Sequence, residues 1–189
     1  MRTATTFSGR AGLRIVAILM AAMFVLAACG SDDSSSEGKK ATDLLNEGLQ
    51  AQVQGETSEA TTKFNEVIEL DPSNKFAHYN LGLIEQTAGK DNEAESNYRL
   101  AIAVDAEYAP ALYNLAILRD KDGATEEAID LYTRATTADP KFASAFLNLG
   151  LLLHETGNTA GANTALTTAV QLNPELAARI PDDAKPDGS

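Results

Sequence analysis

The feature that most constrains this chain is a 34-residue spacing that recurs four times, without a gap, after residue 40. Each unit has small residues at its eighth and twentieth positions and a large side chain at its twenty-fourth. These residues are Gly48, Gly82, Ala116 and Gly150, then Ala60, Ala94, Ala128 and Ala162, then Phe64, Tyr98, Tyr132 and Leu166. Small residues let two helices approach closely while the large side chain fills the space between them, so each unit is predicted to be a helical hairpin. The predicted units are 41–74, 75–108, 109–142 and 143–176.

Turn residues repeat in the same register. A glycine stands at the fifteenth position of every unit, where the first helix must stop and a left-handed conformation is favoured. These glycines are Gly55, Gly89, Gly123 and Gly157. Two residues later come side chains that are predicted to cap the second helix by accepting a hydrogen bond from its free amides. They are Thr57, Asp91, Thr125 and Thr159.

This pattern resembles the tetratricopeptide (TPR) repeat family, which has the same period and the same anchor positions. The resemblance implies an all-α fold, a right-handed solenoid of four helix-turn-helix repeats in which each hairpin buries its apolar face against its neighbours. It also implies a protein-binding module and no enzyme. Glu47, Glu85 and Ala106 depart from the family's pattern and weaken single units without disturbing the period.

In this family the sixth position of each repeat points into the concave groove of the solenoid. Here it is asparagine in all four repeats, namely Asn46, Asn80, Asn114 and Asn148. The row resembles the asparagine ladder of the O-GlcNAc transferase repeat domain, which implies that it grips the backbone of an extended peptide, because an amide side chain both donates and accepts. An apolar lining for the peptide's side chains is predicted from neighbouring positions, with Tyr79, Tyr113, Leu83 and Ile117 as its central members. The alternative is that asparagine is a polar residue tolerated on an exposed helix face.

Other chemistries find little support in the sequence. A carboxylate clamp needs lysine and arginine at groove positions that here hold Leu45, Leu49 and Pro110. His78 and His154 occupy different repeat positions, so no repeated metal site is predicted, and His78 is expected to be structural. We find no nucleophile paired with a base, no phosphate loop and no cofactor fingerprint. The sequence therefore predicts no catalytic residue, no metal and no cofactor.

The first 28 residues have the order of an export signal. A basic stretch ends at Arg14, an apolar run follows from Ile15 to Ala28, and the only cysteine comes next, in Leu26-Ala27-Ala28-Cys29. This resembles the lipobox of bacterial lipoproteins, which implies that residues 1–28 are removed and that Cys29 carries a diacylglyceryl group. Two acyl chains would hold the protein stably on a membrane. Residues 29–40 are rich in Gly, Ser and charge and are predicted to be a flexible linker.

Charge excludes one class of partner. The 15 basic residues are outnumbered by 27 acidic ones, for a formal net charge of −12, and loss of a signal carrying Arg2, Arg10 and Arg14 would make the chain more acidic still. Nucleic-acid binding needs clustered basic residues, so nucleic acid is not a predicted partner.

Residues 177–189 are predicted to be a short disordered tail that leaves the last repeat weakly capped, which would allow a homo-oligomer to form there. The overall prediction is a scaffold or adaptor of the bacterial cell envelope, similar in general plan to lipoprotein pilotins. It would be lipid-anchored on the extracytoplasmic side and bind other envelope proteins or peptide segments. The alternative is a self-associating structural lipoprotein with no specific peptide ligand.

Overall fold

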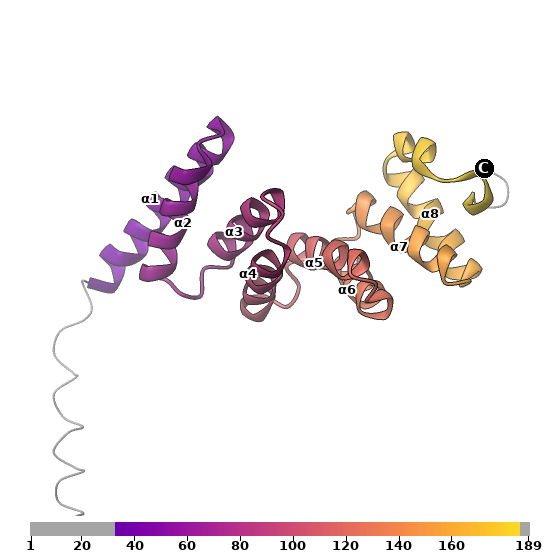
Figure 1. Cartoon of the computed structure of the whole chain (residues 1–189), viewed down its shortest axis with the longest axis horizontal. Helices are drawn as coiled ribbons and strands as arrows, with labels where there is room; N and C mark the ends of the chain where they lie inside the picture. The colour runs from indigo at the N-terminus through magenta and orange to yellow at the C-terminus, as the bar shows by residue number, and fades with distance from the viewer. Residues whose placement is uncertain (1–32, 186–189) are drawn as a thin grey trace, which may run out of the picture. The chain divides into compact units, whose positions relative to one another are not determined.

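The computed structural model describes residues 33–185, so the predicted signal peptide and Cys29 lie outside the described residues. Helices are the only regular secondary structure in the described part (Figure 1). The α-helices are α1 (Asp33–Gln54), α2 (Thr57–Leu70), α3 (Lys75–Thr87), α4 (Asp91–Val104), α5 (Ala109–Lys121), α6 (Thr125–Ala138), α7 (Ala143–Glu155) and α8 (Thr159–Leu172). Two short 3₁₀-helices follow, η1 (Pro174–Arg179) and η2 (Asp182–Ala184).

Four helix-turn-helix hairpins follow one another along the chain, in the predicted 34-residue register (Figure 1). The second helix of each hairpin packs against the first helix of the next, through α2–α3, α4–α5 and α6–α7. The predicted all-α fold of consecutive helical hairpins is confirmed.

The turn inside each hairpin has one geometry, set by its glycine. Gly55, Gly89, Gly123 and Gly157 have φ of 79°, 74°, 77° and 82°. In the first hairpin Gly55 N–H donates to the Gln52 carbonyl and Glu56 N–H to the Ala51 carbonyl. The same pair of bonds recurs after α3, α5 and α7. This is a Schellman motif, which satisfies the last carbonyls of the first helix and requires a left-handed residue, so the prediction for these glycines is confirmed.

The predicted caps of the second helices are wrong by one residue. Thr57, Asp91, Thr125 and Thr159 are the first residues inside their helices, and the N-cap positions are Glu56, Lys90, Ala124 and Asn158. Among these four only Asn158 accepts a capping bond, from Gly161 N–H at 3.1 Å. The second helix starts one residue earlier than predicted, because the Schellman turn is followed directly by the N-cap and the first helical residue.

Close packing within each hairpin depends on the small residue at the eighth position. A Cβ atom added at Gly82 would lie 2.6 Å from Tyr98 Cε1, and one at Gly48 would lie 2.7 Å from Phe64 Cε1. Phe64, Tyr98, Tyr132 and Leu166 are all buried. The large side chain of the second helix therefore lies directly against the backbone of the first, as predicted.

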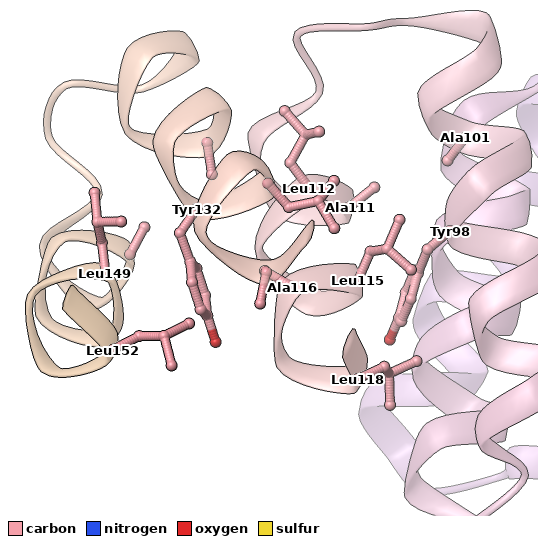
Figure 2. Close-up of a cluster of buried hydrophobic side chains, with 14 of the residues drawn as sticks. Tyr98, Ala101, Ala111, Leu112, Leu115, Ala116, Leu118, Tyr132, Leu149 and Leu152 are labelled. Atoms are coloured by element: carbon pink, nitrogen blue, oxygen red, sulfur yellow. The ribbon is translucent and has the colours of Figure 1, made fainter. Parts of the chain in front are cut away.

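The central core joins the second, third and fourth hairpins. Leu112 and Leu115 of α5 lie between Tyr98 of α4 and Tyr132 of α6 (Figure 2). Leu118 of α5 and Leu149 and Leu152 of α7 belong to the same cluster. Both tyrosine hydroxyls point to the same side of the cluster (Figure 2). Tyr98 Oη donates to Gln86 Oε1 at 2.6 Å, so its ring is buried while its polar end is satisfied.

The two ends of the array differ from the prediction. Helix α1 begins at Asp33, so residues 33–40 of the predicted flexible linker are helical. At the other end, η1 and η2 bury Leu176, Ile180 and Ala184 in a cluster with Leu147 and Leu166. The prediction of a disordered tail from residue 177 is therefore wrong up to residue 185. The last hairpin is covered by this chain's own residues, which removes the basis for a weakly capped repeat.

Candidate peptide-binding surface

Two of the four predicted asparagines each bond to a tyrosine of the preceding repeat. We call these residues, Asn114 with Tyr79 and Asn148 with Tyr113, the Asn–Tyr row. Asn114 Nδ2 donates to Tyr79 Oη at 3.3 Å, and Asn148 Nδ2 donates to Tyr113 Oη at 3.3 Å. Asn148 Nδ2 also donates to Tyr132 Oη at 3.3 Å. These bonds connect residues 35 apart, the sixth position of one repeat to the fifth of the repeat before. The row therefore helps to hold successive repeats in register.

The other two asparagines behave differently. Asn80 is only 8% exposed, and its Nδ2 donates to the Phe76 carbonyl at 2.8 Å. The preceding repeat has Leu45 at the fifth position, which offers no hydroxyl to bond. Asn46 is exposed, and none of the hydrogen bonds found among residues 33–185 involves its side chain. Asn80 is thus buried, and Asn114 is half-buried and bonded, so neither is a polar residue on a fully exposed helix face.

Bonding within the row leaves part of its hydrogen-bonding capacity unused. No hydrogen bond in the described part of the chain is accepted by the Oδ1 atoms of Asn114 and Asn148. A tyrosine hydroxyl that accepts a bond keeps its own proton to donate. The surface along α5 and α7 thus presents carbonyl-type acceptors beside hydroxyl donors, which is the combination that complements a peptide backbone.

The apolar lining is only partly as predicted. Tyr79, Tyr113, Leu83 and Ile117 are half-buried and pack against the central core, so each keeps an accessible face. Leu49 is more open, at 37% exposed. Leu147, at the fifth position of the last repeat, is fully buried in the cluster with Leu166 and cannot contribute to this lining.

Aromatic contacts fix the orientation of the tyrosines. The Tyr113 ring centroid lies 4.7 Å from that of Phe142 and 5.9 Å from that of Tyr132. Tyr79 packs edge-on against Tyr108 at 5.3 Å. Burial raises the pKa of Tyr113, while the Arg179 guanidinium and the Asn148 amide act against that rise. Tyr113 is therefore neutral at physiological pH and retains its hydroxyl proton.

A cavity of about 350 Å³ opens beside the end of the row. Tyr113, Ile117 and Asn148 line it, together with three charged residues that the sequence analysis missed, Asp120, Glu155 and Arg179. Arg179 follows the last repeat, so no periodicity could place it; only the path of η1 brings it to this cavity.

The histidines do not form a metal site in the part of the chain that the structure describes, where no cluster of metal-ligating side chains occurs. His78 is buried, with its Nδ1 3.1 Å from Asn97 Oδ1 and its Nε2 3.0 Å from the Pro72 carbonyl. His154 lies 3.6 Å from Asp183. In residues 33–185 no helix has the length and apolar character needed to cross a membrane.

Comparisons with known proteins agree with this fold. A tetratricopeptide repeat model matches residues 77–108 and 143–176, and a TPR repeat model matches residues 120–157. No curated protein matches the sequence.

Many solved structures match the fold. The MamA protein is 24% identical with a TM-score of 0.63, over 72% of this chain and 75% of its own. PilF of Pseudomonas aeruginosa is 27% identical with a TM-score of 0.64, over 74% of this chain but only 64% of its own. A tetratricopeptide repeat protein from Parabacteroides merdae is 22% identical with a TM-score of 0.62, over 77% of this chain and 56% of its own. The chain thus carries tetratricopeptide repeats, a fold typical of protein–protein interaction scaffolds.

Proposed function

We propose that this protein is a lipid-anchored adaptor of the bacterial cell envelope, which binds extended segments of other proteins along the Asn–Tyr row. The observation that carries the binding part is the unused hydrogen-bonding capacity of the row, beside the accessible faces of Leu83 and Ile117. A segment in extended conformation presents an N–H and a carbonyl on alternate sides at about 3.3 Å per residue. Its backbone can therefore bond to the row while its side chains contact the apolar faces.

The proposed envelope location is supported by the sequence of the N-terminus. The basic stretch, the apolar run and the lone Cys29 match a lipoprotein signal. A diacylated Cys29 would place the repeats at a membrane surface, from which they can hold partner proteins.

Binding is tested by measuring retention of the full chain, solubilised in mild detergent, on arrays of short degenerate peptides. We expect Ile117→Asp to weaken retention, because it puts a charge on the apolar part of the surface. Leu100→Asp is the matched control, since Leu100 is 48% exposed on α4, away from the row. N-methylation of the peptide backbone should also weaken retention, because it removes N–H donors. Thermal unfolding of each variant separates loss of binding from loss of fold. Tyr113→Phe is a second variant that removes only the hydroxyl group and should weaken retention less than Ile117→Asp.

Failure of the full chain to retain any peptide would contradict the binding proposal. If Ile117→Asp and Leu100→Asp reduce peptide retention equally, the peptides do not bind along the Asn–Tyr row. If the protein instead self-associates in light scattering and binds no peptide, the alternative of a structural lipoprotein is correct.

Anchoring is tested separately by fractionating cells that produce Cys29→Ser. We expect the variant to move from the membrane to the soluble secreted fraction, because the thiol that would carry the lipid is gone. A variant that stays in washed membranes after its signal is removed would show that lipid on Cys29 is not the anchor.

A further inference from the structure

The cavity beside the end of the Asn–Tyr row combines apolar walls with charge at its rim. Its walls include the side chains of Tyr113, Tyr132, Ile117 and Leu151, from α5, α6 and α7. Asp120, near the end of α5, and Glu155, at the end of α7, also line it, and both are exposed. Its volume of about 350 Å³ is sufficient for a long side chain.

The two rim carboxylates have no partner in the part of the chain that the structure describes. Neither Asp120 nor Glu155 forms an ion pair or a side-chain hydrogen bond there. Other carboxylates in the same repeats are paired, as Glu127 is with Arg99 and Arg119 at 2.8 and 2.9 Å. Arg179 lines the cavity too, yet it forms no ion pair with either carboxylate within that part of the chain. The cavity therefore has two available carboxylates and one cation, a net negative charge.

The walls also suit a cation with an aliphatic stem. The rings of Tyr113 and Tyr132 lie at a tilt of 56° with centroids 5.9 Å apart, and an ammonium or guanidinium over such a ring is attracted to its face. The methylene groups of a lysine or arginine can contact Ile117 and Leu151 while the charge stays at the rim. An acidic side chain would meet two like charges in the same place.

We propose that this cavity receives a lysine or arginine side chain of the bound partner segment, with Asp120 and Glu155 as its counter-charges. The inference rests on the proposed peptide-binding function and adds the chemistry of the partner, which is a basic residue within an otherwise apolar extended segment. The segment's backbone would bond to Asn148 Oδ1 and the Tyr113 hydroxyl. The acidity of the whole chain, with a formal net charge of −12, also favours approach of a basic segment.

The test uses immobilised peptides of about eight residues, long enough to cover two repeats, with one fixed residue in a degenerate background. The full chain in mild detergent is compared with an Asp120→Asn, Glu155→Gln double variant. An equal change in net charge is provided by Glu93→Gln with Glu107→Gln, because both of these glutamates are exposed and lie outside the cavity. Circular dichroism confirms that each variant is folded.

We expect peptides with a fixed lysine or arginine to be retained about threefold to tenfold better than those with a fixed aspartate, as two partly solvated charge contacts would give. The double variant should lose this preference and the control pair should keep it. The inference is overturned if basic residues are not preferred, or if both pairs of substitutions abolish the preference equally. A preference for acidic residues that Arg179→Ala abolishes would overturn it in favour of a carboxylate ligand. In each of these outcomes peptides still bind, so the proposed function stands; if no peptide binds, both fail.

Discussion

At the scale of single residues, the same side chains serve both packing between repeats and the candidate binding surface. Asn114 and Asn148 each donate to a tyrosine of the preceding repeat and still present an unbonded oxygen. Asn80 donates to the Phe76 carbonyl instead, because Leu45 has no hydroxyl. A row that is uniform in sequence is thus not uniform in bonding, and substitutions along it will differ in effect.

The inter-repeat bond can be measured by a double-mutant cycle of Asn114→Ala and Tyr79→Phe. We expect each substitution to lower the free energy of unfolding by about 0.5–1.5 kcal/mol, the usual contribution of such a bond. Because the two groups bond to each other, the effects should not be additive. Asn46→Ala, at an exposed position without a described bond, should change stability by less than about 0.5 kcal/mol. Strictly additive effects would mean that the 3.3 Å contact contributes nothing in solution.

The close contact of Gly82 with Tyr98 gives a second prediction at this scale. Gly82→Leu should lower the free energy of unfolding by about 1–3 kcal/mol or more, because the new side chain has no space beside the buried ring. Gly38→Leu is the matched control, since nothing lies within 4 Å of a Cβ atom at Gly38 in the same kind of helix. Equal melting temperatures for the two variants, measured by circular dichroism, would contradict the close contact.

At the scale of elements, the segment after α8 completes the last repeat. A hairpin leaves one apolar face open unless the next repeat or a cap covers it. Here η1 and η2 supply Leu176, Ile180 and Ala184 in place of a full capping helix. The same segment carries Arg179 to the candidate cavity. The cap and one wall of the cavity are therefore the same element.

This role of η1 predicts the effect of Leu176→Ala. Removing the buried side chain should cost about 2–5 kcal/mol locally and increase amide exchange in α7 and α8 more than in α3 and α4. Leu172→Ala changes the same residue type at a position 39% exposed and should have a smaller effect. Light scattering should also show that Leu176→Ala self-associates more than the parent, since the last face is uncovered. Unchanged exchange in α7 and α8 would mean that η1 is not the cap.

At the scale of the whole molecule, acidic residues outnumber basic ones, yet several ion pairs join neighbouring helices. Arg99 and Arg119 both bond to Glu95 and Glu127, which connects α4, α5 and α6. The hydrogen bond from Arg99, with that from Arg119, lowers the pKa of Glu127. Lowering the pH therefore removes this attraction, while it also relieves the repulsion among the excess carboxylates.

The lowered pKa of Glu127 determines the sign of a pH prediction. Its contribution to stability is fully present above the ordinary pKa of a glutamate, about 4.3, and is lost as the pH falls through the lower pKa of the folded state. Glu127→Gln should thus destabilise the protein at pH 7, by no more than about 1 kcal/mol because the pair is partly solvated. At pH 3 the difference from the parent should shrink. Asp130→Asn, whose carboxylate is 67% exposed and 3.7 Å from Arg134, serves as the control in urea unfolding. A difference that grows on acidification would contradict the sign.

The sequence by itself determined the repeat. The fixed spacing of Gly82 against Tyr98, and of Gly55 in its turn, predicted both the hairpins and their register, because close packing and positive φ admit few residue types. Only the tertiary structure decided the rest. Which partner each asparagine bonds to depends on the residue at the fifth position of the preceding repeat, Leu45 or a tyrosine. The caps moved by one residue because the turn geometry sets where the helix starts. The segment after α8 has no periodicity, so the sequence could not place it. Its apolar residues are removed from water only when they pack on α7 and α8, and this packing covers the last hairpin and brings Arg179 to the cavity.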